Sequence, residues 1–140
     1  MTQRPPLAGM HHVALHARQF EKTLTFYTEL FGMAVEWRPD DDNVYLTSGT
    51  DNLAIHRATG DIVEGAQRLD HIGFLVDEPG DVDGWYQYLT ANDVAVDAPP
   101  RTHRDGARSF YCKDPEGTTV QIIHHPPLAR VDARGAEHGS

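Results

Sequence analysis

Hydrophobic and polar positions follow two different periods in the first half of the chain. Side chains alternate between polar and apolar over residues 12–16, which predicts a strand. From residue 19 onward apolar residues recur at helical spacing as far as Gly32, a residue type typical of a helix C-terminus. Three more strands are predicted over residues 34–37, 43–46 and 52–56, with turn residues between them. The predicted order is therefore β, α, β, β, β.

The second half repeats this pattern. A shift of 59 residues places His12 on His71 and superposes strand, helix and following strand. Gaps confined to turns then bring Tyr45 onto Tyr111 at a shift of 66, and His56 onto Gln121 at a shift of 65. A run of matched histidine, aromatic and aliphatic positions indicates an internal duplication.

A βαβββ unit has one helix and covers one face of its sheet, so two units are expected to complete each other. The prediction is an α+β fold in which two βαβββ repeats form a curled, cup-shaped mixed sheet of about eight strands, with the helices outside. A single domain is expected over residues 8–126, with repeat one at about 8–60 and repeat two at about 67–126. The segments 1–7 and 127–140 are expected to be tails. A concave sheet face is a natural place for a ligand.

Charge and residue usage narrow the function. Lys and Arg number 12 against 21 Asp and Glu, a formal charge of −9, which argues against a nucleic-acid partner. No apolar run is long enough to cross a membrane and no secretory leader is apparent, so a cytoplasmic protein is expected. Cys112 is the single cysteine, which excludes an intramolecular disulfide and a thiolate zinc cluster. Nine histidines leave imidazole and oxygen as metal ligands.

Four positions are candidate metal ligands. His12 and His71 begin the first strand of each repeat, and His56 and Gln121 are matched on the last strands. Each side chain offers a lone pair to a divalent ion. The competing interpretation is that these histidines complete polar networks at strand ends. Their symmetric placement favours the metal site.

The segment from residue 103 to residue 121 contains two candidate catalytic residues. His103 precedes Phe110 and Tyr111, and the sequence Asp-Pro-Glu-Gly at 114–117 predicts a tight turn before the strand carrying Gln121. An imidazole here can move protons, and the Tyr111 phenol can bond a substrate oxygen. Core packing is the alternative role for Tyr111, and a plain hairpin is the alternative for the segment.

These motifs resemble the vicinal oxygen chelate superfamily, which includes glyoxalase I, epimerases, extradiol dioxygenases and metal-free bleomycin-binding proteins. The resemblance rests on His12-Val-Ala-Leu, the helix ending before Gly32, Asp70-His71-Ile-Gly-Phe and the turn at 114–117, and it covers about residues 8–126. It implies one divalent metal ion held by His12, His56, His71 and Gln121. Most such enzymes have a glutamate where this chain has Gln121.

The resemblance implies a metal-dependent enzyme acting on a small oxygen-chelating substrate, with extradiol ring cleavage favoured because 103–121 is similar to the dioxygenase signature. Fe(II) or Mn(II) is then the favoured ion, with Ni, Co or Zn as alternatives. His103 is implied in substrate binding or proton transfer and Tyr111 in stabilising a substrate oxygen. The alternatives are a glyoxalase- or epimerase-type lyase or isomerase, and a metal-free protein that binds an aromatic antibiotic-like molecule. A homodimer is expected.

Overall fold

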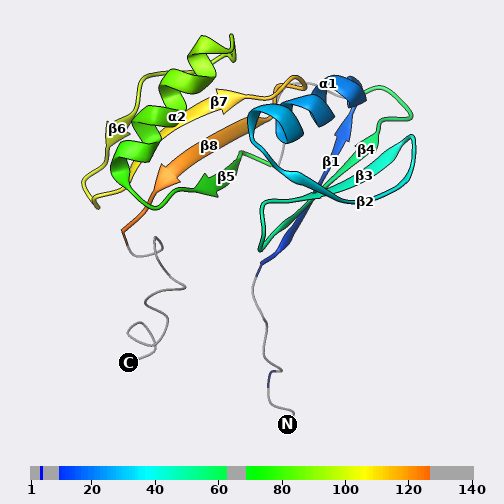
Figure 1. Cartoon of the computed structure of the whole chain (residues 1–140), viewed down its shortest axis with the longest axis horizontal. Coiled ribbons are helices and arrows are strands. Elements are labelled where there is room, and N and C mark those ends of the chain that lie inside the picture. The colour runs from blue at the N-terminus through cyan, green and yellow to red at the C-terminus, as the bar shows by residue number, and fades with distance from the viewer. Residues whose placement is uncertain (1–3, 5–9, 63–68, 127–140) are drawn as a thin grey trace. The chain divides into compact units, whose positions relative to one another are not determined.

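The computed structural model of the chain describes residues 4, 10–62 and 69–126, and it divides into two compact units, Met1–Val63 and Glu64–Ser140. Each unit contains one four-stranded sheet and helical structure that follows its first strand (Figure 1). Apart from Arg4, the tails predicted for 1–7 and 127–140 lie outside the described residues.

Unit 1 follows the predicted order of elements. These are β1 (His12–Ala17), α1 (Phe20–Thr25), η1 (Phe26–Leu30), β2 (Ala34–Asp40), β3 (Asn43–Thr47) and β4 (Asn52–Arg57). The spatial order is β1-β4-β3-β2, in which β1 runs parallel to β4 and the other neighbours are antiparallel. Alternate side chains such as Leu15, Val44 and Ile55 are buried on one face, against α1 with Phe20 and Thr23.

The predicted helix changes its winding halfway. Residues 26–30 form a π-helical turn, η1, and the Thr28 hydroxyl donates to the Leu24 carbonyl over 2.7 Å. A side chain that bonds a carbonyl of the preceding turn competes with the regular ladder. Gly32 adopts φ +75° just after the helix, as expected of a residue that ends it in the left-handed region.

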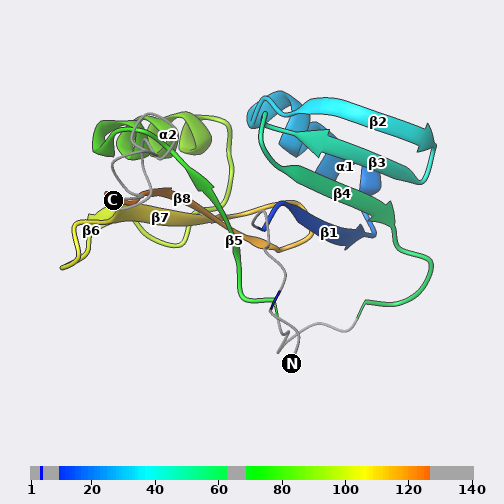
Figure 2. The same cartoon turned by 90° about the horizontal axis from the view of Figure 1, so that it is seen from below.

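Unit 2 repeats this architecture with different lengths. Its elements are β5 (Ile72–Leu75), α2 (Pro79–Ala91), β6 (Arg101–Thr102), β7 (Arg108–Lys113) and β8 (Thr119–His124). The spatial order is β5-β8-β7-β6, again with the first and last strands parallel. In each unit the helix lies across one face of the sheet (Figure 2). We call the opposite face of each sheet its open face.

Two local features of unit 2 follow from its sequence. The Asp114 carboxylate accepts the backbone N–H groups of Glu116 and Thr118, and Gly117 has φ +86°, which confirms the predicted turn. The strand that the shift of 59 places around Val94 is reduced to an isolated bridge at Val96 and the two residues of β6. The neighbouring prolines at 99 and 100 have no N–H to pair, so the strand is interrupted there.

The α+β class and the repeated units are confirmed, and the eight strands of the described residues belong to two four-stranded sheets rather than to one continuous sheet. Among the described residues, no helix has the length and apolar content to span a membrane.

Candidate functional site

Unit 2 brings three of the predicted site residues together on its open face. The Gln121 amide donates from Nε2 to the Tyr111 hydroxyl over 3.2 Å, because the two residues are paired across β7 and β8. The His71 ring meets the Tyr111 ring edge-on, with 5.3 Å between ring centroids. Gly73 lies beside Gln121 in the parallel β5–β8 pair and has no side chain to cover the amide oxygen. His71, Tyr111 and Gln121 therefore form one polar cluster.

The partners of His71 leave one ring nitrogen available. His71 Nδ1–H donates to the Asp70 carboxylate over 2.7 Å. A carboxylate accepts but does not donate, so Nε2 keeps its lone pair and points away from this bond. Metal-binding histidines are commonly oriented by this kind of carboxylate contact.

Gln121 is oriented in a comparable way. Its amide nitrogen is used by Tyr111, so the amide oxygen, Oε1, is the atom left to face a ligand. A methyl group built on Gly73 would lie 3.5 Å from this oxygen. The oxygen is a neutral donor where a glutamate would bring a negative charge.

His103 lies on the same open face, toward the β6 edge. Its Nε2 is 3.2 Å from the Ser109 hydroxyl, and its Nδ1 is 3.4 Å from a guanidinium nitrogen of Arg101. Arginine only donates, so Nδ1 accepts and the proton is on Nε2, which donates to Ser109. Neutral His103 thus links Arg101 to Ser109 on β7. Ser109 lies two residues from Tyr111 along that strand.

In unit 1, His12 is held by a chain of two further polar residues. His12 Nδ1–H donates to Asn52 Oδ1 over 2.6 Å, and Asn52 Nδ2 donates to the Glu36 carboxylate over 2.6 Å. The chain fixes the His12 tautomer and leaves Nε2 with its lone pair.

The strand register corrects the expected equivalence of His56 and Gln121. Gln121 lies beside Gly73 and Tyr111, and the residue in the same place in unit 1 is Ala54, beside Ala14 and Tyr45. The shift between repeats on this strand is thus 67, not 65. The shift of 65 made the turn between β7 and β8 one residue shorter than the turn between β3 and β4, whereas the register makes it one residue longer.

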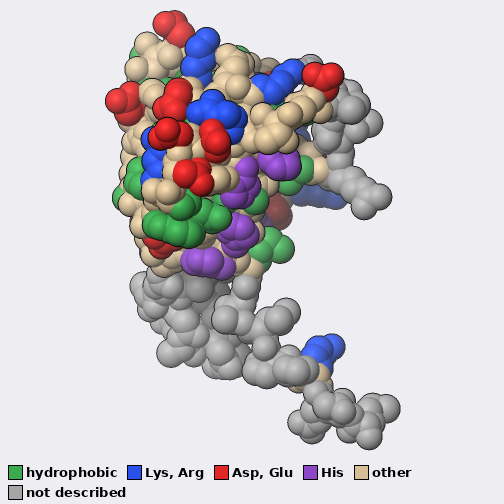
Figure 3. Space-filling model, turned by 90° about the vertical axis from the view of Figure 1, so that its right-hand side faces the viewer, with side chains coloured by type: hydrophobic (Ala, Val, Ile, Leu, Met, Phe, Trp, Pro, Cys, Tyr) green, Lys and Arg blue, Asp and Glu red, His purple; other side chains and the backbone are tan. Residues whose placement is uncertain are grey.

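His56 consequently lies beside His16, with 6.2 Å between ring centroids, and four residues along the sheet from the level of His12. That is roughly 13 Å at strand rise. His56 is held by its own chain: its Nδ1–H donates to Asn43 Oδ1 over 2.6 Å, and Asn43 Nδ2 donates to Asp40 over 2.8 Å. The backbone N–H of Asp42, then the Asn43 amide, hold the pKa of Asp40 below its usual value. Figure 3 shows how histidine side chains gather on the surface.

The thiol of Cys112 does not add a metal ligand to these side chains. Cys112 is buried, and burial followed by the nearby Asp114 and Asp97 charges raises its pKa to about 12, so the thiol stays protonated. Among the described residues, no three His, Cys, Asp or Glu side chains are grouped closely enough to hold a metal ion. The described units thus contain partial donor sets: His12 in unit 1, and His71 with Gln121 in unit 2.

The polar residues that orient these donors were not predicted. Asp70 adjoins His71 in the sequence, and that adjacency was the available signal. Asn52 and Asn43 reach their histidines only through strand pairing at a separation of 40 and 13 residues, for which the sequence gives no local sign.

Comparison with known proteins identifies the class. The model of the Glyoxalase/Bleomycin resistance protein/Dioxygenase superfamily matches residues 9–122, and the chain belongs to this superfamily. This confirms the resemblance to vicinal oxygen chelate proteins. No curated protein sequence gives a significant match.

Solved structures agree on the fold. A lactoylglutathione lyase from Agrobacterium tumefaciens is similar with a TM-score of 0.72 at 22% identity, covering 88% of this chain and 98% of that one. A glyoxalase/bleomycin resistance protein/dioxygenase from Alicyclobacillus acidocaldarius gives 0.67 at 18%, covering 84% and 92%. TioX from Micromonospora sp. ML1 gives 0.68 at 18%, covering 84% and 99%.

Proposed function

We propose that the protein is a divalent-metal-dependent enzyme of this superfamily, acting on a small substrate that presents two adjacent oxygens, with extradiol ring cleavage as its reaction. The observation that carries the proposal is the orientation of three donors. His12 and His71 each use Nδ1 in a bond that leaves Nε2 free, and Gln121 uses its nitrogen in a bond that leaves Oε1 free.

The donor chemistry fits a divalent ion. Two imidazole nitrogens and one amide oxygen suit Fe(II), Mn(II), Ni(II), Co(II) or Zn(II). We leave His56 out of the proposed ligand set, because the register aligns it with His16 and not with His12. The proposed ligands are therefore His12 of unit 1 and His71 and Gln121 of unit 2.

The donor set favours ring cleavage over glyoxalase- or epimerase-type chemistry. Those proton transfers use a metal-bound carboxylate as base in the enzymes that this chain resembles. The two equivalent strand positions here are Ala54 and Gln121, and neither can accept a proton in that way. Two histidines with a third oxygen donor are instead close to the two-histidine, one-carboxylate arrangement of non-haem iron oxygenases.

The chain's own residues then take the following roles. A divalent ion bound by these donors would supply Lewis-acid polarisation of two neighbouring substrate oxygens. Tyr111 accepts a hydrogen bond from Gln121 and keeps its own O–H to donate to a substrate oxygen. His103 bonds Ser109, which lies two residues from Tyr111 along β7, and its Nδ1 would accept a proton once Arg101 takes another partner.

One observation supports a second candidate function, metal-free binding of an aromatic molecule. Trp37 and Tyr45 stack on unit 1 with 5.2 Å between centroids and an interplanar angle of 23°, and 57% of Trp37 is exposed. An exposed stacked pair offers a flat surface to a planar ligand.

The deciding experiment is elemental analysis of untagged protein purified anaerobically without chelator, compared with the double variant His12→Ala/His71→Ala. We expect near-stoichiometric metal in the wild type and its loss in the variant. The double variant His11→Ala/His16→Ala, which removes two histidines from the same region of the chain, is the control and should keep the metal.

The identity of the ion directs the next assay. Iron or manganese leads to oxygen uptake and ring cleavage with catechols, and nickel, cobalt or zinc leads to lyase and isomerase assays. Absence of metal after reconstitution would overturn the proposal and favour the aromatic-binding protein.

A further inference from the structure

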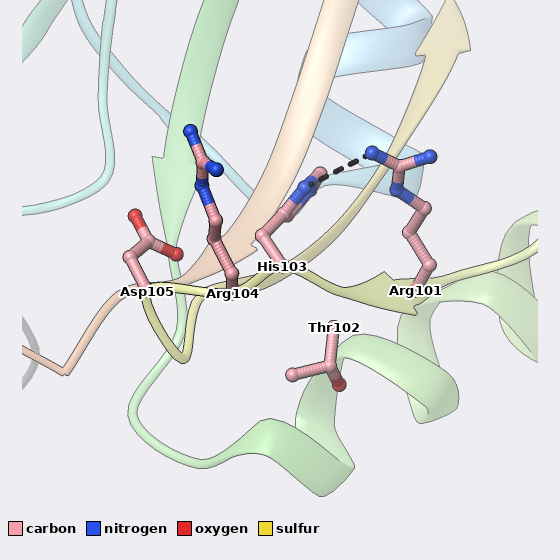
Figure 4. A pocket seen from close by; sticks show the side chains of 5 residues that line it. All are labelled: Arg101, Thr102, His103, Arg104 and Asp105. Atoms are coloured by element: carbon pink, nitrogen blue, oxygen red, sulfur yellow. Dashed lines mark hydrogen bonds between the residues drawn. The ribbon is translucent and has the colours of Figure 1, made fainter.

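A pocket of about 490 Å³ lies at the β6 edge of unit 2, lined by Arg101, Thr102, His103, Arg104 and Asp105. We call it the arginine pocket. Arg101, His103 and Arg104 extend to one side of this segment and Thr102 to the other (Figure 4). Because Arg101 pairs with Ser109 on the sheet and His103 bonds the same serine, the pocket continues the open face that carries Tyr111.

Arg101 and Arg104 differ from Arg38, Arg57 and Arg108 in having no acidic partner among the described residues. Arg38 pairs with Glu21, Arg57 with Asp42, and Arg108 with Asp83. Within 4, 10–62 and 69–126, neither arginine of the pocket has a carboxylate within salt-bridge distance. This is unusual in a chain of net charge −9. Two guanidinium groups left without counter-charges in one pocket form a binding site for an anion.

The acidic residue of the pocket is directed elsewhere. Asp105 accepts the backbone N–H of Ala107 over 2.9 Å, and its other oxygen is 3.7 Å from His125 Nε2. The backbone N–H of Ala107 holds the pKa of Asp105 below its usual value. Its charge is thus committed to its own loop and to His125.

An anion can replace the contact that holds the Arg101 guanidinium. Its single bond within this pocket is to the Nδ1 lone pair of neutral His103 at 3.4 Å, a long and weak contact. A bidentate oxyanion offers the guanidinium two shorter, charge-assisted bonds. Binding would release His103 Nδ1 toward the same pocket.

We infer that the arginine pocket binds the carboxylate or phosphate of an anionic substrate, held by Arg101 and Arg104 beside His103. The inference rests on the proposed function, since it names the substrate class: a molecule with an oxyanion at one end and two adjacent oxygens at the other. Ser109 and Tyr111 are two residues apart on β7, roughly 7 Å at strand rise, so the two ends are separated by about one aromatic ring.

The test measures anion binding by isothermal titration calorimetry, using the metal-free full chain. Inorganic phosphate and benzoate are the probes, and their two arms decide between phosphate and carboxylate. We expect saturable binding of at least one probe in the millimolar range or tighter. We expect Arg101→Gln/Arg104→Gln to weaken it at least about tenfold, the equivalent of about 1.4 kcal/mol. Arg38→Gln in unit 1 removes one positive charge outside the pocket, as each single variant does inside it, and should bind like the wild type.

Three results would overturn the inference: no saturable binding by the wild type, unchanged binding by the double variant, or equal weakening in Arg38→Gln. The two arginines have no described acidic partner, so the double variant is expected to fold, which far-UV circular dichroism checks. If it does not, each single glutamine variant must lose part of the binding.

The result is independent of the metal hypothesis, because the protein is metal-free and no turnover is measured. Suppose the wild type binds the anion, the double variant loses this binding, and elemental analysis finds no metal. The inference about the arginine pocket would then stand, and only the proposed reaction would be overturned. If the protein holds metal but the pocket binds no anion, the proposed reaction would stand and the anionic substrate class would be overturned.

Discussion

The two units share a strand register but present different chemistry on their open faces. Tyr45 and Tyr111 occupy the same place in the two sheets, each beside the parallel pair formed by the first and last strands. In unit 2 the neighbouring strand provides Gln121, and the tyrosine hydroxyl accepts its amide N–H. In unit 1 it provides Ala54, and the tyrosine ring stacks on Trp37 instead.

This difference shows that the two repeats keep the same buried core but carry different side chains on their open faces. The side chains facing the helix must fill a closed core, so buried apolar residues recur in both units. The open faces differ in their polar and aromatic contacts, and a single pair of residues changes each one. A donor such as Gln121 on one unit therefore does not imply a donor at the equivalent place on the other.

The largest expected effect compares His12 with His56. His12→Ala should lower metal affinity by more than about 100-fold, because it removes a proposed ligand, whereas His56→Ala should change it by less than about threefold. Competition with a chromophoric chelator measures both. Equal losses in the two variants would show that His56 is a ligand after all and that the strand register does not decide the ligand set.

A smaller effect is expected at the asparagines that accept hydrogen bonds from His12 and His56, since each asparagine orients its histidine in the same way. Asn52→Ala removes the acceptor that orients His12 and should lower metal affinity by about 10- to 100-fold. Asn43→Ala makes the matching change beside His56 and should leave the affinity as it is. The same chelator competition applies to this pair, with thermal unfolding as the check on folding. Asn43→Ala weakening the metal as strongly as Asn52→Ala would contradict the asymmetry.

Much of the fold was predictable because its signals are local. Alternation over 12–16, helical spacing up to Gly32 and the Asp-Pro-Glu-Gly turn each act within a few residues, and each appears where expected. The π-helical turn at Phe26–Leu30 and the shortened β6 were not predicted. Both depend on competition between bonds, at Thr28 and around two prolines, which periodicity does not register.

The sequence predicted which residues belong to the candidate site, but it did not predict which residues bond to them. The sequence predicts His71, Tyr111 and Gln121 as site residues, and the three lie together within unit 2. The shift of 65 misplaced His56, because loop lengths are not constrained by the hydrophobic pattern and an error of two residues keeps the same strand face. The role of Asn52 depends on pairing across 40 residues, which required the structure.

The smallest expected effect concerns how each unit ties its helix to its sheet. In unit 2 the Arg108 guanidinium forms two bonds to Asp83, at 2.6 and 2.9 Å, and in unit 1 Glu21 is reached by Arg38 at 3.3 Å and by Arg57 at 3.6 Å. All of these pairs are partly exposed, so each contributes little to the free energy of unfolding. The two-bonded geometry should nevertheless make Asp83→Asn more destabilising than Glu21→Gln, with a fall in Tm of about 3 °C or less.

The pH dependence sharpens this last comparison. The bond from Arg108 holds the pKa of Asp83 below its usual value, so Asp83 stabilises the folded state in its ionised form. That contribution is complete above the unfolded-state pKa and is lost as the pH falls through the lower, folded-state pKa. The Tm difference between wild type and Asp83→Asn should therefore be constant from neutral pH down to about pH 5 and shrink steadily below about pH 4. A difference that persisted unchanged into acid would assign the effect to packing of the side chain rather than to its charge, and would remove the distinction between the two helix attachments.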